Sequence, residues 1–235
     1  MGASADPGPR PPLGRRRDGW VVLIPVKRLS AAKTRLDMPH RDQVALAMSA
    51  DTADAAAAAA LVDAVVVITD DPRALAALSL AGAPDTPVSV LPDAPRAGLN
   101  AALRYGARVA ATRYPDAGRA ALAGDLPALR PAELDRALAV AAAGGGRAFV
   151  ADAAGTGTVL LCAQAGWELR PAFGPGSRAA HAQSGARDLT GALGTEVAGL
   201  RRDVDTPGDL LVAAALGVGP RTSRALPTDQ EGLRG

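Results

Sequence analysis

The chain has 235 residues and a formal net charge of +2 at pH 7, a length sufficient for one sizeable α/β domain. Hydrophobic residues make up 48% of the chain but aromatic residues only 3%, so stacking platforms for nucleic-acid bases are almost absent. Outside residues 1–19, which hold four arginines and two aspartates, basic and acidic side chains balance, and no nucleic-acid partner is expected. Cys162 is the single cysteine, which excludes a disulfide framework and predicts a buried, inert thiol.

The two ends of the chain differ in composition from the middle. Residues 1–19 contain four prolines and no apolar core, so neither a signal peptide nor an amphipathic transit helix is predicted. Residues 1–19 and 218–235 are rich in Pro, Gly, Arg and Ser, and both are interpreted as flexible tails around a single domain at 20–217. No apolar stretch is long enough to span a membrane, and a cytoplasmic protein without a membrane partner is expected.

Short apolar runs alternate with longer helix-forming segments along the middle of the chain. In chain order, the predicted strands are Trp20–Val26, Ala64–Thr69, Val88–Leu91, Ala120–Ala123, Ala148–Ala151 and Gly157–Cys162. The predicted helices are Arg41–Ala60, Pro72–Ala81, Leu99–Thr112, Pro131–Ala143, Arg178–Arg187 and Pro207–Leu216. Continuous apolar strands separated by helices are typical of the α/β class, with a mainly parallel mixed sheet covered on both faces.

The loop after the first predicted strand gathers four cations, Lys27, Arg28, Lys33 and Arg35, and holds both lysines of the chain. Because the chain uses arginine everywhere else, two compact ammonium groups here indicate a requirement of a site. At the carboxyl end of a parallel strand, such a cluster would face a phosphate-bearing substrate. The alternative is a solvated basic turn. Neither a P-loop nor a Gly-x-Gly-x-x-Gly fingerprint is present, so a phosphate site here is built differently.

Two acidic segments suit a divalent cation. Asp125 follows a predicted buried strand and Gly124, and a single aspartate there can anchor the magnesium of a nucleotide without forming a cage. Asp203 and Asp205 fall on the same face of an extended segment, so either or both could join Asp125 around a metal. Helix capping is the alternative for Asp125. Pro207 is read as the first position of a helix, with Thr206 or Asp205 as its cap.

Two glycine-rich segments, Gly155–Thr158 and Phe173–Ser177, suit a small anion. Exposed amides near Gly174, together with the hydroxyls of Thr158 and Ser177, would bind a carboxylate or a phosphate. Ser177 also fits the cap of the helix that follows it. The alternative for both segments is a tight turn.

The two histidines, His40 and His181, lack the spacing of metal ligands, so neither a zinc site nor a histidine-based dyad is predicted. Ser177 lies near His181 but has no nucleophile-elbow context, and a hydrolase is discounted. Both histidines are expected to be surface or locally hydrogen-bonded side chains.

Five motifs resemble, in the same order, those of the phosphoenolpyruvate / 2-phospho-L-lactate guanylyltransferase family, which acts in the biosynthesis of the deazaflavin coenzyme F420. They are Ile24–Arg28 with Ala32–Leu36, Gly124–Pro127, Gly155–Thr158, Phe173–Ser177 and Asp203–Pro207, and the match spans about residues 20–220. The resemblance is greatest to actinobacterial members that use phosphoenolpyruvate. It implies a single-domain nucleotidyltransferase with a glycosyltransferase-A-like, Rossmann-related fold.

The resemblance also implies ligands and residue roles. The implied substrates are GTP and phosphoenolpyruvate, the implied cofactor is Mg²⁺, and the product could pass to the next enzyme of the pathway. Contacts to phosphoenolpyruvate carry over to Thr158, Gly174 and Ser177. The metal-binding acids carry over to Asp125 and to the pair Asp203 and Asp205. The resemblance does not determine which residue of this pair is the ligand. The four cations of the first loop would bind the triphosphate.

In the implied reaction, the phosphate of phosphoenolpyruvate attacks the α-phosphorus of GTP and releases pyrophosphate. Because a phosphate with a second pKa of about 6 is mostly ionised at pH 7, no general base is needed, which fits the lack of a catalytic histidine. The alternatives are 2-phospho-L-lactate or 3-phosphoglycerate as acceptor, another nucleotidyltransferase reaction on this fold, and a catalytically inactive nucleotide-sensing protein.

Overall fold

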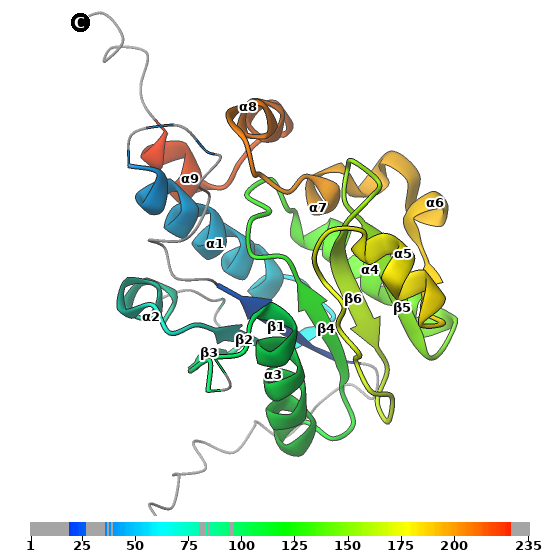
Figure 1. Ribbon diagram of the computed structural model, residues 1–235. Coiled ribbons are helices and arrows are strands. Elements are labelled where there is room, and N and C mark those ends of the chain that lie inside the picture. The colour runs from blue at the N-terminus through cyan, green and yellow to red at the C-terminus, as the bar shows by residue number, and fades with distance from the viewer. Residues whose placement is uncertain are drawn as a thin grey trace, which may run out of the picture.

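A computed structural model of the chain describes residues 19–26, 36, 38, 40–79, 83, 85–94 and 96–226. In this part of the chain, a seven-stranded sheet has the strand order β3-β2-β1-β4-β6-β5-β7 (Figure 1). The strands are β1 (Trp20–Pro25), β2 (Val62–Ile68), β3 (Val88–Leu91), β4 (Gly118–Leu122), β5 (Arg147–Ala151), β6 (Thr158–Ala163) and β7 (Arg187–Asp188). The helices are α1 (Arg41–Ala57), α2 (Pro72–Leu78), α3 (Leu99–Arg113), α4 (Pro131–Ala143), α5 (Ser177–Gln183), α6 (Thr190–Leu193), the 3-10 helix η2 (Gly194–Val197), α7 (Ala198–Arg201), α8 (Pro207–Leu216) and α9 (Pro220–Ala225). None of these helices is long and apolar enough to cross a membrane.

Strands β1 to β4 run in the same direction, and α1, α2 and α3 supply the crossovers that parallel strands require. β1 pairs in parallel with β2 and with β4, and β2 pairs in parallel with β3. β6 is antiparallel to both β4 and β5, whereas the short β7 is parallel to β5. The prediction of a mainly parallel mixed sheet is therefore confirmed.

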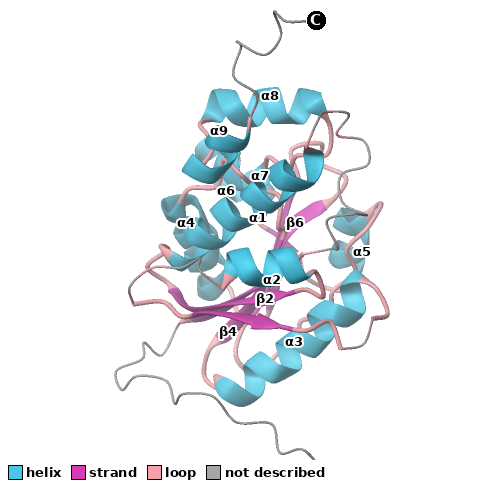
Figure 2. Ribbon diagram, turned by 90° about the vertical axis from the view of Figure 1, so that its left-hand side faces the viewer, coloured by secondary structure: helices cyan, strands magenta, loops and turns pink. Residues whose placement is uncertain are grey.

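Helices cover both faces of the sheet, and alternate side chains of each strand pack against one layer or the other. Val22 and Ile24 of β1 lie in a core cluster with residues of α1, α2 and α4. Val21 and Leu23 lie in a second cluster with residues of α3. Figure 2 shows α3 across the strands from α1 and α4. Because all four side chains are fully buried, β1 is the continuous apolar run expected of a central parallel strand.

Small side chains let α1 pack closely against the sheet and the loop after β4. Ala53 and Ala56 of this helix are fully buried in the core. The Thr52 hydroxyl donates to the carbonyl oxygen of Met48 at 2.8 Å and accepts the N–H of Leu126 at 3.1 Å. This second bond holds the loop after β4 on α1.

The C-terminal part of the domain differs from the prediction. Helix α9 packs against α1, where the Asp51 carboxylate accepts the N–H groups of Arg221 and Thr222 at 3.1 and 2.7 Å. The expectation of a flexible tail from residue 218 is therefore wrong for residues 218–226, because a buried carboxylate fixes this segment. The remaining residues of both expected tails, 1–18 and 227–235, lie outside the described residues.

Two further differences concern the region after β6. The helix predicted over Arg178–Arg187 begins at Ser177 and ends at Gln183, because Gly185 turns the chain with φ 83° and the next residues enter β7. α6, η2 and α7 were not predicted. Each has four residues, which is too short to show a helical period of apolar residues.

Cys162 lies in β6, fully covered by the core of the sheet. Only 1% of its surface is exposed, and burial raises the pKa of its thiol. The prediction of a buried cysteine is therefore confirmed, and a thiol that stays protonated and inaccessible is expected to be unreactive.

Candidate active site

A cleft of about 630 Å³ opens at the carboxyl ends of β1 and β4. The strand order reverses here, since β2 and β3 extend the sheet on one side of β1 and β4 begins the other side. Open α/β sheets bind their ligands at such switch points. The cleft is lined by the end of β1, the loop after β4, the starts of α3 and β6, segment 173–177, and Asp203 and Asp205.

Asp125 lines the cleft from the loop after β4. The sequence predicts this location, because Asp125 follows a buried strand. Gly124 before it passes close to β1, since a Cβ at this position would lie 3.1 Å from the carbonyl oxygen of Pro25. A larger residue would push the loop away from the strand. The carbonyl oxygen of Asp125 accepts the N–H of Val204 at 3.1 Å, which brings the segment of Asp203 beside the loop.

Asp203 lies half-buried among other carboxylates. Burial first, and then the negative charges of Asp125 and Asp152, raise its pKa to about 7, with a smaller contribution from Asp205. All four carboxylates line one cleft, and the charges of the other three act on Asp203. Among the described residues, no three His, Cys, Asp or Glu side chains form a ready-made metal cluster. Asp125, Asp203 and Asp205 are the residues of the cleft that could hold a divalent cation together with oxygen atoms of a substrate.

Thr206, and not Asp205, caps helix α8. The Thr206 hydroxyl accepts the N–H of Asp209 at 3.2 Å, and the Asp209 carboxylate accepts the N–H of Thr206 at 3.0 Å. Pro207 is the first helical residue, as the sequence predicted. The reciprocal bonds of Thr206 and Asp209 form a capping box, which was not predicted. Asp205 is exposed and lines the cleft.

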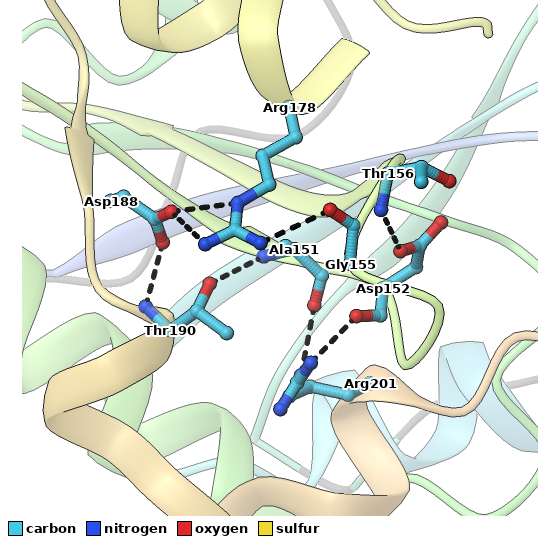
Figure 3. A network of polar contacts seen from close by, with 8 residues as sticks. All are labelled: Ala151, Asp152, Gly155, Thr156, Arg178, Asp188, Thr190 and Arg201. Carbon is cyan, nitrogen blue, oxygen red and sulfur yellow. Dashed lines mark hydrogen bonds and ion pairs between the residues drawn. The ribbon is translucent and has the colours of Figure 1, made fainter. Parts of the chain in front are cut away.

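Asp152, at the end of β5, organises the turn that leads to Thr158. Its carboxylate accepts the N–H of Thr156 at 3.0 Å (Figure 3) and the N–H of Gly157 at 2.8 Å. Arg201 of α7 donates to the carbonyl oxygens of residues 151 and 152 at 3.1 and 2.8 Å. The turn is therefore fixed on the sheet by a carboxylate and a guanidinium group.

Arg178 ties the same turn to α5 and β7. Its guanidinium donates to the carbonyl oxygen of Gly155 at 3.1 Å and to the Asp188 carboxylate at 2.9 Å (Figure 3). The other oxygen of Asp188 accepts the N–H of Thr190 at 2.9 Å. The short elements β7 and α6, which the sequence did not predict, thereby anchor one wall of the cleft.

Asn100, in the first turn of α3, holds the loop that carries Gly174 and Ser177. Its amide donates to the carbonyl oxygen of Phe173 at 2.9 Å, and its side-chain oxygen accepts the N–H of the same residue at 2.8 Å. Gly174 follows with φ 133°, which favours glycine. The cap of α5 is Gly176, with φ 72°, so the expectation that Ser177 caps this helix is wrong. Ser177 is instead its first residue, buried at the cleft wall.

His181 is fully buried beside the cleft. Its Nδ1 lies 2.9 Å from the Thr158 hydroxyl, and its Nε2 accepts the N–H of Ala172 at 2.9 Å. Burial, and then the positive charge of Arg147, lower its pKa to about 4, so the ring is neutral at pH 7. His181 is thus locally hydrogen-bonded and His40 is exposed, the two situations expected from the sequence.

The cleft brings together six of the predicted site residues: Asp125, Thr158, Gly174, Ser177, Asp203 and Asp205. The four predicted triphosphate-binding cations, Lys27, Arg28, Lys33 and Arg35, lie outside the described residues. Asp152 was not predicted, although it follows an apolar strand just as Asp125 does, and this signal could have found it. Asn100 was also missed, because nothing in its own sequence surroundings marks a residue that clamps a loop 73 positions away.

The fold, with its cleft at the switch point, is one that solved nucleotidyltransferases also have. A solved structure of 4-diphosphocytidyl-2C-methyl-D-erythritol synthase from Anaerococcus prevotii has the same fold, with a TM-score of 0.55 over 85% of this chain and 96% of that chain, at 8% identity. The family model of guanylyl transferases described as CofC like matches residues 20–219, and the chain belongs to that family.

Two relatives are named phosphoenolpyruvate guanylyltransferase. The protein of Thermomonospora curvata is 54% identical over 207 residues, which cover 87% of each chain. The protein of Frankia casuarinae is 50% identical over 231 residues, which cover 91% of this chain and 79% of that protein. Both similarities extend over most of the described domain.

Proposed function

We propose that the protein transfers the guanylyl group of GTP to phosphoenolpyruvate, giving enolpyruvoyl-2-diphospho-5'-guanosine and pyrophosphate in coenzyme F420 biosynthesis. The observation that carries this proposal is that three predicted anion-binding residues and three predicted metal-binding acids line one cleft. The names of the two relatives agree with it. Both substrates are small cytoplasmic metabolites, so we place the enzyme in the cytoplasm and expect its product to pass to the next enzyme of the pathway.

Phosphoenolpyruvate would bind at Thr158, Gly174 and Ser177. The hydroxyl-bearing residues Thr158 and Ser177 are buried, with 8% and 2% of their surfaces exposed. Hydrogen bonds from buried hydroxyls to a carboxylate or phosphate are stronger than they would be in water. The clamp from Asn100 holds the loop of Gly174 before substrate arrives, which reduces the ordering that binding requires.

The donor set of the cleft fits Mg²⁺. Asp125 and Asp203 offer the hard oxygen ligands that this ion prefers, and Asp205 offers a third at the exposed rim. Burial is the main cause of the raised pKa of Asp203, and the nearby charges of Asp125 and Asp152 add to it; a cation beside these carboxylates would offset that charge contribution. Mg²⁺ bound there would supply charge neutralisation for the triphosphate of GTP.

The remaining work of the protein is to bind and orient the two substrates. An oxygen of the phosphoenolpyruvate phosphate forms a bond to the α-phosphorus of GTP, while the bond from that phosphorus to the bridging oxygen breaks. The electron pair of the broken bond leaves with pyrophosphate. Because the attacking phosphate is mostly ionised at pH 7, no side chain has to remove a proton, and alignment and charge neutralisation supply the acceleration.

The test measures pyrophosphate release and product mass with purified protein, Mg²⁺ and pairs of substrates. Each of four nucleoside triphosphates is combined with phosphoenolpyruvate, 2-phospho-L-lactate or 3-phosphoglycerate. We expect a guanylyl adduct of phosphoenolpyruvate alone. An adduct of another acceptor would contradict the proposed acceptor but keep the reaction class. No pyrophosphate from any pair would contradict the proposed activity as a whole.

The basic loop offers a separate prediction. Lys27→Ala and Lys33→Ala are each expected to lower kcat by about 10²-fold, the scale for loss of one preorganised contact to a charged transition state. Arg113→Ala is the matched control, since Arg113 is an exposed cation at the far end of α3. Steady-state kinetics with GTP and phosphoenolpyruvate measure the effect. Normal turnover in both lysine variants would show that the loop does not bind the triphosphate.

A further inference from the structure

His181 connects all three proposed acceptor-binding residues. It lies on α5 one turn after Ser177, and its Nδ1 lies 2.9 Å from the hydroxyl of Thr158 on β6. Its Nε2 accepts a hydrogen bond from the N–H of Ala172, two residues before Gly174 in the same loop. The reaction described above uses no side chain at this position as an acid or a base, so the buried ring calls for another explanation.

The bond from Ala172 determines which ring nitrogen carries the hydrogen. A backbone N–H can only donate, so Nε2 must present its lone pair and carry no hydrogen. In a neutral imidazole the hydrogen then lies on Nδ1, and Nδ1–H donates to the Thr158 hydroxyl oxygen. The ring is neutral at pH 7 because burial and Arg147 lower its pKa to about 4. Phe149 and Phe173 flank it, with ring centroids 5.9 and 5.2 Å away.

This tautomer sets the direction of the Thr158 hydroxyl. Because its oxygen accepts a hydrogen from His181, its own hydrogen is directed to a different acceptor. Thr158 lines the cleft, and no acceptor for that hydrogen is found among the residues that the structure describes. A carboxylate or phosphate oxygen in the cleft would complete the bond.

We propose that His181 is a positioning residue that holds the Thr158 hydroxyl as a hydrogen-bond donor toward the anionic acceptor substrate. Ala172 locks the ring in the tautomer that this role requires. The proposal rests on the proposed function, since it takes the acceptor as the ligand of Thr158. It concerns the acceptor half of the cleft alone and predicts no direct effect on GTP.

Two substitutions separate the two bonds of the ring. In His181→Gln the side-chain oxygen can still accept from Ala172, but no group donates to Thr158. In His181→Asn the amide can still donate to Thr158, but Ala172 loses its acceptor. We expect His181→Gln to raise the KM for phosphoenolpyruvate about 10-fold, the scale of one hydrogen bond to a charged group, with the KM for GTP unchanged. His181→Asn should raise the KM for phosphoenolpyruvate by a smaller factor.

A double-mutant cycle tests whether His181 acts through Thr158. Thr158→Val should also raise the KM for phosphoenolpyruvate about 10-fold, and adding His181→Gln to it should raise this KM little further. Thermal unfolding shows whether each variant is folded. If the two effects multiplied, if His181→Asn were worse than His181→Gln, or if the KM values for both substrates rose together, His181 would have a structural role only.

The tautomer can be measured in the wild-type protein without substrate. Long-range ¹⁵N–¹H spectra distinguish the two neutral forms of histidine, and His40→Asn assigns the signals because the chain has only two histidines. We expect hydrogen on Nδ1 of His181, and hydrogen on Nε2 would overturn the proposal even if no variant folded. If the wild-type chain used another acceptor, the proposed function would be contradicted. The same variants, measured by their KM for that acceptor, would still test the role of His181.

Discussion

Replacement of Asp125 by asparagine is expected to lower kcat for guanylyl transfer by about 10³-fold while the protein stays folded. Asparagine keeps the shape of the side chain but removes the negative charge that the proposed cation site requires, and such charge stabilisation contributes several kcal/mol to a transition state. The backbone bond between Asp125 and Val204 does not involve the side chain, so the neighbouring segment should stay in place. Steady-state kinetics at saturating Mg²⁺ and thermal unfolding measure the two effects.

Asp116→Asn is the matched control for this substitution. Asp116 is exposed in the turn before β4 and lies outside the cleft, so the same chemical change there should leave kcat within about two-fold of the wild type. A folded Asp125→Asn variant with near-normal turnover would exclude Asp125 as a ligand of the cation.

Gly199→Ala should lower the free energy of unfolding by about 3 kcal/mol and the melting temperature by about 9 °C. Gly199 lies in α7 directly over the loop before α4, and an added Cβ would overlap the backbone carbonyl oxygen of Ala128. The N–H groups of Gly199 and Leu200 both donate to the Glu133 carboxylate at 3.0 Å. A shift of α7 away from Ala128 would therefore break these hydrogen bonds. Calorimetry or denaturant unfolding measures the loss.

Gly191→Ala in α6 is the matched control, because it makes the same substitution in a helix without a steric overlap. Nothing lies within 4 Å of a Cβ at Gly191, and alanine is the better helix former, so this variant should be as stable as the wild type or slightly more stable. Equal stability of the two alanine variants would contradict the prediction. It would mean that the backbone around Ala128 moves to accommodate the added Cβ without loss of stability.

The sequence predicts best those elements whose ends carry local signals. Helices α4 and α8 have the predicted bounds because each begins with a proline at its first position and ends before a glycine. β3 also has the predicted bounds, set by Pro87 and Pro92 on either side of its apolar run. The position of Asp125 just after a predicted parallel strand is enough to place it at the edge of the sheet where ligands bind. That β1 and β4 are neighbouring strands, so that their carboxyl ends meet there, is known only from the structure.

Interactions between distant segments could not be predicted in the same way. The clamp of Asn100 on Phe173 and the bonds of His181 join segments that only the folded sheet brings together. Helix α9 was missed for the same reason, since its position depends on Asp51, which lies 171 positions away from Thr222. Local propensity carries no information about such pairs, and a single sequence offers no covariation that would reveal them.

The place of β1 in the sheet has a consequence for how the protein folds. β1 comes first in the chain but lies in the interior of the sheet, between β2 and β4. Until β4 pairs with it, a subdomain made of β1, β2 and β3 exposes one edge of a strand whose side chains are almost all apolar. Such open apolar edges pair with other chains during folding. The yield of refolded enzyme should therefore fall as protein concentration rises, and the pairing of β1 with β4 closes this route to aggregation.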